Sequence, residues 1–140
     1  MTYTPLANLK EFHDTFAPHQ RSEEFLSKTE RRINLICEEY EEVAQAILYL
    51  EDTRLNMTSG TVAEAKEELA KELADLLYVV YGTAEELDIP IEEVFKTVHQ
   101  SNMSKVWEDG EVHYNEFGKV IKPPTYSKPD LSFIHDNRFL

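Results

Sequence analysis

The sequence predicts an all-α protein, a bundle of four helices followed by an extended C-terminal arm. Three observations support this fold class. Apolar residues recur three and four positions apart in four segments, which places them on one face of an α-helix. Helix-breaking residues separate these segments at Pro18, over residues 56–60 and at Pro90. After Val106 come residues that prevent a long helix, namely Gly110, Gly118, Pro123, Pro124 and Pro129.

The first two helices are expected over residues 5–16 and from Ser22 to about Asp52. Ser22 suits the N-cap position because two glutamates follow it at the positive end of the helix. The apolar face of the first helix is formed by Leu6, Leu9, Phe12 and Phe16. The apolar face of the second helix is formed by Ile33, Ile36, Tyr40, Val43, Ile47 and Leu50.

The third helix is expected from about Thr61 to Leu87, and the fourth from Pro90, a residue favoured in the first turn, to about Lys105. The main apolar face of the third helix comprises Val62, Leu69, Leu73, Leu76, Leu77, Val80, Ala84 and Leu87. In the arm, residues 111–114 and 119–121 are predicted to form short strands of a hairpin, with Trp107 as an anchor.

Length and composition limit the classes of protein to which the chain can belong. A chain of 140 residues is expected to form one domain, with a helical core over residues 5–106 and the arm over residues 107–140. The formal net charge of −13 repels nucleic-acid backbones, so neither DNA nor RNA is an expected partner. A single cysteine excludes an internal disulfide and a Cys-based zinc site. Without a signal-peptide pattern or a membrane-spanning apolar run, a cytoplasmic location is expected.

Two of the predicted helices carry acidic residues beside their apolar stripes. Glu38 and Glu39 lie four and three residues before Glu42, and Glu72 lies three residues before Asp75. Residues at these spacings share a helix face, with Cβ atoms about 5–6 Å apart. Packing the two apolar stripes together therefore brings both acidic groups toward one edge of the bundle.

Carboxylates this close repel one another unless a cation lies between them. Mg²⁺ takes about six oxygen ligands, usually from carboxylates, waters and phosphates, so we interpret the acidic groups as a magnesium site. Two other interpretations stay open. With 27 acidic residues, solvated acidic faces arise without any metal. The second is a di-iron site, which needs Glu-x-x-His pairs. None of the five histidines has a glutamate three residues before it, and this weakens the di-iron interpretation.

The pattern Glu38-Glu39-x-x-Glu42 followed by Glu72-x-x-Asp75 resembles the signature of the all-α nucleotide pyrophosphohydrolases. This superfamily includes MazG, the dimeric dUTPases and the phosphoribosyl-ATP pyrophosphohydrolases. The resemblance implies a bundle of the MazG-like type. It also implies that these five acids bind Mg²⁺, or Mn²⁺ as a substitute, with Glu38 either a ligand or a neighbour of the ligands. Glu39 is further implied to accept a proton from the attacking water.

Three further segments, residues 11–13, 72–82 and 99–105, are similar to MazG-like members with dUTPase-type activity. The similarity implies that Asn102 and Lys105 contact sugar or phosphate, and that Lys105 places positive charge near the leaving pyrophosphate.

Aromatic and histidine side chains complete the expected substrate site. Phe12 and His13 are expected to contact the base, and Tyr78 to line the pocket. The alternative that Phe12 and Tyr78 are ordinary core residues, with His13 at the surface, stays open.

The resemblance thus implies hydrolysis of a nucleoside or deoxynucleoside triphosphate to the monophosphate and pyrophosphate, with dUTP or dCTP as preferred substrates. It also implies a homodimer or homotetramer. Two alternatives stay open: hydrolysis of phosphoribosyl-ATP, and a non-catalytic acidic helical module that binds a partner protein. A titration with Mg²⁺ separates the enzyme from the module.

Overall fold

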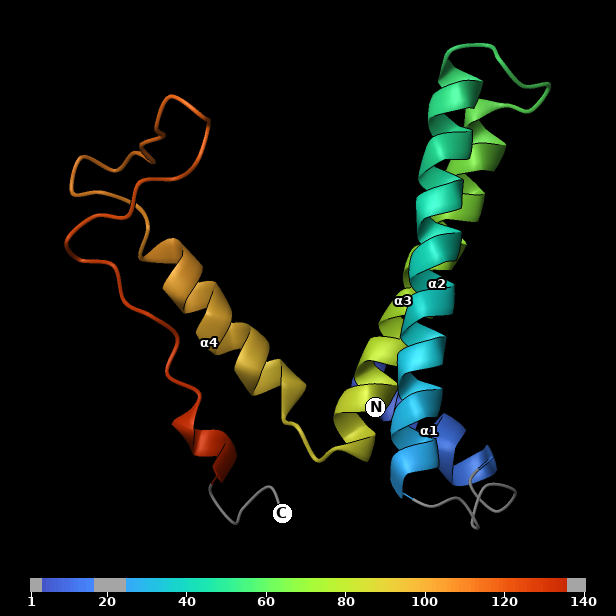
Figure 1. Ribbon diagram of the computed structural model, residues 1–140, viewed down its shortest axis with the longest axis horizontal. Coiled ribbons are helices and arrows are strands. Elements are labelled where there is room, and N and C mark those ends of the chain that lie inside the picture. Colours follow the sequence, from blue (N-terminus) through green and yellow to red (C-terminus); the bar gives the residue numbers. More distant parts are fainter. Residues whose placement is uncertain (1–3, 17–24, 136–140) are drawn as a thin grey trace. The chain divides into compact units, whose positions relative to one another are not determined.

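The computed structural model describes residues 4–16 and 25–135 and is helical (Figure 1). No β-strand occurs in these two ranges, so the predicted all-α class is confirmed. The helices are α1 (Pro5–Phe16), α2 (Phe25–Arg54), α3 (Val62–Glu86), α4 (Ile91–Met103) and the short 3-10 helix η2 (Ser132–His135). The chain divides into two compact units, Met1–Glu86 (unit 1) and Leu87–Leu140 (unit 2), and each is described by itself.

The predicted helix limits agree with the observed ones to within a few residues. The expected N-cap at Ser22 lies outside the described residues. Pro90 takes the N-cap position of α4 instead of its first turn. The short η2 helix lies in a tail that the sequence predicted to be extended.

In unit 1, α2 and α3 pack side by side as an antiparallel hairpin, and α1 packs on α3 (Figure 1). The hairpin turns at Asn56, which has a left-handed backbone with φ 56°. The amide of Met57 donates to the Asp52 carbonyl at 2.9 Å, and the amide of Asn56 to the Thr53 carbonyl at 3.1 Å. This pair of bonds is a Schellman motif, which satisfies carbonyls at the end of α2 and reverses the chain.

A capping box starts α3 directly after this turn. The Glu64 carboxylate accepts hydrogen bonds from the Thr61 amide at 2.9 Å and from the Thr61 hydroxyl at 2.8 Å. The Thr61 hydroxyl in turn accepts a bond from the Glu64 amide at 3.2 Å. The box satisfies amides that have no partner within the helix, and so it fixes where α3 begins.

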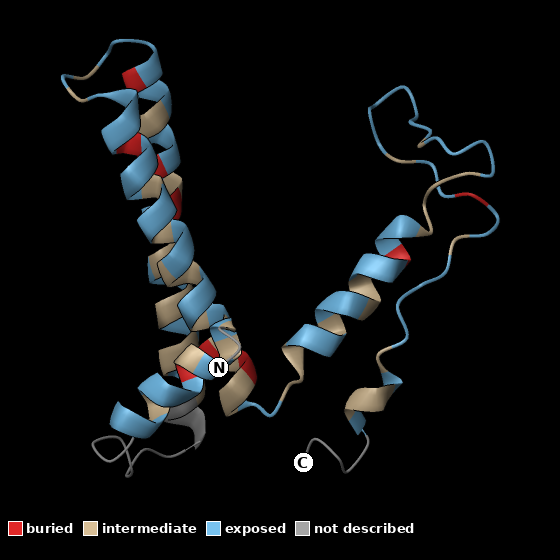
Figure 2. Ribbon diagram, turned by 180° about the vertical axis from the view of Figure 1, so that it is seen from behind, coloured by how far each residue is buried: buried red, intermediate tan, exposed pale blue. Residues whose placement is uncertain are grey.

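The core of unit 1 is a narrow seam of mostly small side chains. Its buried apolar residues are Leu9, Val43, Ala46, Ala65 and Ala84. Small residues allow the helices to approach closely, and larger residues beside the seam then face outward. Figure 2 shows that most of α2 and α3 is exposed or half-buried.

The predicted apolar faces are therefore only partly correct. Val43 and Ala84 are buried, but many large members of the two stripes are exposed in the structure, namely Ile33, Tyr40, Ile47, Val62, Leu73, Leu77, Val80 and Leu87.

Unit 2 consists of α4 and the arm, which folds against the end of that helix. The buried Ser101 hydroxyl donates to the Ser127 carbonyl at 2.8 Å, and the Ser127 amide donates to the Ser104 hydroxyl at 3.0 Å. The Trp107 ring nitrogen donates to the Ile121 carbonyl at 3.0 Å, which confirms Trp107 as an anchor of the arm.

The predicted hairpin of the arm is reduced to a single antiparallel bridge between Tyr114 and Val120. Gly118, with φ 73°, makes the tight turn between them. The side chain of Asn115 accepts bonds from the amides of Phe117 and Lys119, so local turn contacts replace an extended ladder. No helix in the described part of the chain has the length and apolar character needed to cross a membrane.

Candidate functional site

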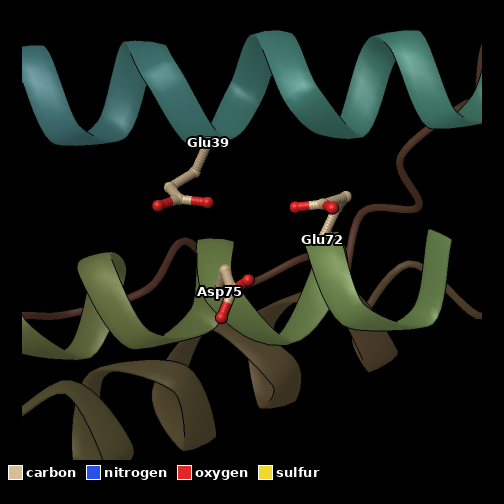
Figure 3. A group of neighbouring side chains, drawn as sticks. All are labelled: Glu39, Glu72 and Asp75. Carbon is tan, nitrogen blue, oxygen red and sulfur yellow. The ribbon is translucent and has the colours of Figure 1, made fainter. Parts of the chain in front are cut away.

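Three acidic side chains of unit 1 converge between two helices. Glu39 extends from α2 and Glu72 from α3 into the space between the helices, and Asp75 lies beside Glu72 on α3 (Figure 3). One carboxylate oxygen from each lies within 4.8 Å of the others. All three residues are half-buried. Of the five acids that the sequence placed at one edge of the bundle, the structure brings these three together.

Glu42 and Glu38 extend this acidic group along α2. The Glu42 carboxyl shares a hydrogen bond with the Glu72 carboxyl, and this bond raises the pKa of Glu42 above its usual 4.5. A bond between two carboxyls requires one of them to hold a proton, which explains the direction of the shift. Glu38 lies outside the group of three and is exposed, but its charge helps to raise the pKa of both Glu39 and Glu42.

Burial raises the pKa of the Glu39 carboxyl above its usual 4.5, and the charges of Glu42 and Asp75 raise it further. Removal from water disfavours a carboxylate, and like charges nearby disfavour it again. The Glu39 Oε2 atom is buried and accepts no hydrogen bond from any described residue. A buried carboxylate oxygen of this kind needs a partner, and a cation would provide one.

Lys71 supplies the counter-charge to this group, a role that the sequence analysis missed. Its ammonium group donates to Asp75 Oδ2 at 2.8 Å and to Glu72 Oε1 at 3.1 Å. These bonds, that to Asp75 first, raise the pKa of Lys71. The signal was available in the sequence, since Lys71 precedes Asp75 by four residues and therefore shares its helix face.

A cavity of about 850 Å³ adjoins the acidic group and lies between α1, α2 and α3. Glu39 and Asp75 line one part of it. Phe12, His13 and Tyr78 also line it, so three predicted substrate residues share a cavity with two predicted metal ligands. The rings of Phe12 and Tyr78 meet edge to face, with centroids 6.1 Å apart.

Charged side chains form another part of the cavity wall, and the sequence analysis did not identify them, apart from His13. His13 Nδ1 lies against the Glu85 carboxylate, and Arg32 Nε forms an ion pair with Glu86. Arg31 also approaches Glu86, at 3.6 Å. No local pattern signals these pairs, because their members lie on different helices, far apart along the chain.

Asn102 and Lys105 belong to unit 2, at the C-terminal end of α4. The Lys105 ammonium donates to Asn102 Oδ1 at 2.7 Å, so the predicted pair is in direct contact. Nearby in the arm, the Lys122 ammonium lies over the Tyr126 ring, 4.3 Å from its centre. A hydrogen bond with Ser101, together with the charges of Lys122 and Lys105, lowers the pKa of Tyr126.

The acidic group fits a hard divalent cation. It offers oxygen ligands alone, from two facing helices, and one of these oxygens is buried without a hydrogen-bond partner among the described residues. Such a donor set suits Mg²⁺ or Mn²⁺ and does not suit a soft metal that prefers sulfur.

Comparison with known proteins gives one family. Residues 9–102 match a family model described as phosphoribosyl-ATP pyrophosphohydrolase. The match covers all of α2 and α3 and most of α1 and α4, and it includes every acidic residue of the group. A search of curated proteins gives no match.

Proposed function

The chain belongs to the phosphoribosyl-ATP pyrophosphohydrolase family, and from this premise we propose that it hydrolyses a nucleoside or deoxynucleoside triphosphate to the monophosphate and pyrophosphate. Members of this family are hydrolases of phosphoric anhydride bonds that generally use a divalent metal. Membership therefore counts against the alternative of a non-catalytic acidic module.

The observation that carries the proposal is the position of the acidic group beside a large cavity. A nucleotide has a polyphosphate that needs cations and a base that needs an apolar or aromatic surface. Glu39 and Asp75 border the cavity that Phe12 and Tyr78 also line, so one molecule can meet both requirements. This arrangement supports a nucleotide over a smaller phosphate ester.

We assign Mg²⁺ as the cation, with Mn²⁺ as a substitute, and Glu39, Glu42, Glu72 and Asp75 as the residues that would hold it. Glu38 would either bind it directly or lie beside the residues that do. When bound, the ion would neutralise phosphate oxygens and increase the acidity of a water molecule.

Glu39 is the proposed acceptor of the proton from the attacking water. Its position supports this role, because its carboxylate lies beside Glu72 and Asp75 and its buried Oε2 accepts no hydrogen bond from a described residue. Water then adds to a phosphorus atom, the bond to the bridging oxygen breaks, and pyrophosphate leaves. Lys105 is the proposed residue that stabilises the charge on the leaving pyrophosphate, and Asn102 orients its ammonium group.

We propose dUTP or dCTP as the preferred substrate. The similarity of residues 11–13, 72–82 and 99–105 to members with dUTPase-type activity supports this preference. Phe12 and Tyr78 offer aromatic faces on which a base of any kind can stack, and His13 offers a polar contact. The second candidate is phosphoribosyl-ATP, and the family description that matches this chain supports it.

We further propose that residues 1–140 act as one enzyme domain and that the protein works in the cytoplasm as a homodimer or homotetramer. The exposed apolar residues along α2 and α3 support an assembly, since exposed apolar patches of this kind often mark contact surfaces.

A panel of nucleotides tests the proposed function. The wild-type protein is incubated with Mg²⁺ and each common ribonucleoside and deoxyribonucleoside triphosphate, or with phosphoribosyl-ATP, and pyrophosphate release is measured. We expect turnover of at least one triphosphate. Glu39→Gln is expected to lower kcat by about 100-fold or more, since a positioned base contributes about 10²–10⁴-fold.

Glu41→Gln is the matched control, because Glu41 is exposed on the same helix and loses the same charge. It is expected to retain wild-type turnover. The proposed function is wrong if no nucleotide is turned over, and the role of Glu39 is wrong if Glu39→Gln remains fully active.

A further inference from the structure

The cavity has a charged region that the proposed mechanism does not use. Arg32 and Glu86 form an ion pair there, and His13 lies against Glu85. The Arg32 side chain is only 11% exposed and that of Glu86 only 18% exposed, so both are held by their surroundings. Charged groups this well covered are costly unless they are paired, and here they also line a cavity large enough for a nucleoside.

These pairs lie away from the acidic group along the helix axes. Arg32 lies seven residues before Glu39 on α2, and Glu86 lies eleven residues after Asp75 on α3. Seven residues of α-helix correspond to about 10 Å, so two turns separate Arg32 from Glu39. If the phosphates bind at the acidic group, as the proposed function requires, the edge of the base farthest from the sugar faces the charged region.

The orientation of Arg32 is fixed by two neighbours. Its Nε donates to Glu86, which uses one of its five N–H groups. Its Nη1 lies beside Gly82, where a β-carbon would be only 2.8 Å away, and His13 Nε2 would be 3.6 Å from the same carbon. The absence of a side chain at position 82 therefore allows the Arg32 and His13 nitrogens to approach the same point on α3.

Aromatic side chains cannot choose between bases, because every base has a face on which they stack. Selection requires directional hydrogen bonds at the edge of the base. An arginine is always a donor and never an acceptor. A donor favours an exocyclic carbonyl oxygen and disfavours an amino group at the same place, which is why arginine pairs with guanine and not with adenine in nucleic-acid recognition.

We infer that Arg32 selects bases that carry a carbonyl oxygen at pyrimidine position 4 or purine position 6 over bases that carry an amino group there. Glu86 and Gly82 are positioning residues for this donor. The inference rests on the proposed function and narrows its substrate class to uracil-type or guanine-type nucleotides. It disfavours cytosine and adenine nucleotides.

Two pairs of nearly isosteric substrates test this inference. The kcat/KM values for dUTP and dCTP, and for dITP and dATP, are compared in the wild type and in Arg32→Gln. A good arginine–base pair is worth about 10- to 100-fold in discrimination. The wild type is expected to prefer the carbonyl member of each pair by that factor, and Arg32→Gln is expected to bring both ratios close to one, mainly through KM.

Arg32→Lys is the second variant, since it keeps the charge beside Glu86 but loses the planar group. It is expected to fold as the wild type does, which circular dichroism checks, and to lose most of the discrimination. Arg54→Gln is the control, because Arg54 is exposed on the same helix and pairs with Glu51. It is expected to keep wild-type ratios.

A binding experiment separates failure of the inference from failure of the proposed function. Calorimetry without metal compares dUMP with dCMP on the wild type and Arg32→Lys, and tighter binding of dUMP to the wild type alone supports the inference. Turnover without preference within either pair overturns the inference and leaves the proposed function intact. An equal loss of kcat/KM on all four substrates in Arg32→Gln would mean that Arg32 has a structural role. That result also overturns the inference.

Discussion

At the scale of single residues, the site depends on how Glu39 is surrounded. Burial and the neighbouring acids raise the pKa of its carboxyl, and one of its oxygens is buried without a hydrogen bond from the described residues. Both features cost free energy in the absence of a cation, and a cation removes both costs. Metal binding at the proposed site is therefore expected to depend most strongly on Glu39.

The raised pKa values predict how metal affinity depends on pH. A carboxyl must lose its proton to bind a metal. The pKa values of Glu39 and Glu42 are raised from 4.5. Mn²⁺ affinity is therefore expected to increase as the pH rises above 4.5 and to continue to increase beyond the point where ordinary carboxyls are ionised. Titrations at a series of pH values check this, and an affinity that stops increasing near pH 4.5 contradicts the assigned environment of these residues.

Lys71 is expected to compete with the metal for the same oxygens. Its ammonium group binds Asp75 and Glu72, but its side chain is 66% exposed, so water weakens these ion pairs. Such pairs are worth about 0.2–1 kcal/mol. Lys71→Gln is therefore expected to strengthen Mn²⁺ binding by roughly 1.5- to 5-fold. Weaker binding would mean that Lys71 supports the site and does not compete for it.

At the scale of helices, local signals predicted the limits of the elements well. The spacing of apolar residues and the breakers at Pro90 and residues 56–60 set these limits, because such signals act over one or two turns. The exposure of Tyr40 and Ile47 was not predicted, since apolar periodicity does not show how wide the contact between two helices is. The ion pair between Arg32 and Glu86 could not be predicted from local spacing either, because the two residues are 54 positions apart.

The acidic group could be predicted from the sequence only in part. Spacing within each helix predicted which acids share a face, and the packing of α2 on α3 then brought Glu39 to Glu72 and Asp75. The sequence signature alone did not show that Glu72 would raise the pKa of Glu42, because this effect depends on the distance between the two helices.

The capping box at the start of α3 gives a prediction for a whole element. Thr61→Ala removes the hydroxyl that accepts a hydrogen bond from the Glu64 amide. Loss of such a cap lowers the free energy of unfolding by about 1 kcal/mol. The expected result is a lower free energy of unfolding with the binding site retained. Urea unfolding followed by circular dichroism measures it, and no loss of stability would show that the cap does not hold α3.

The charge of Glu64 adds a pH dependence to this cap. The Thr61 amide and then the Thr61 hydroxyl lower the pKa of Glu64 below its usual 4.5. A carboxyl with a depressed folded-state pKa stabilises the protein above the unfolded value, and this stability is lost as the pH falls through the folded value. Glu64→Gln is therefore expected to melt below the wild type at about pH 7, and the difference should shrink as the pH falls below 4.5. A difference that stays constant with pH contradicts the role of the charge.

At the scale of the whole molecule, exposed apolar stripes predict an assembly. Ile33, Tyr40 and Ile47 recur at seven-residue intervals on α2, and all three are exposed. This spacing forms one continuous face on a helix. Sedimentation equilibrium is expected to give a mass of at least about twice the 16.3 kDa of one chain.

Ile47→Asp is expected to weaken that assembly, because it places a charge in the stripe. Gln45→Asp is the control, since Gln45 is exposed on the same helix outside the stripe. A wild-type monomer, or an assembly that Ile47→Asp leaves intact, contradicts the assignment of this face.

Direct measurement of cation binding tests the central claim, that acids from α2 and α3 together hold a divalent ion. Calorimetric titration with Mn²⁺ compares the wild type with Glu39→Gln/Asp75→Asn and with Glu41→Gln/Glu67→Gln, a control pair that removes the same charge from exposed positions on the same helices. The wild type and the control pair should bind Mn²⁺, and Glu39→Gln/Asp75→Asn should not. Equal binding by all three proteins, or no binding by the wild type, would contradict the claim.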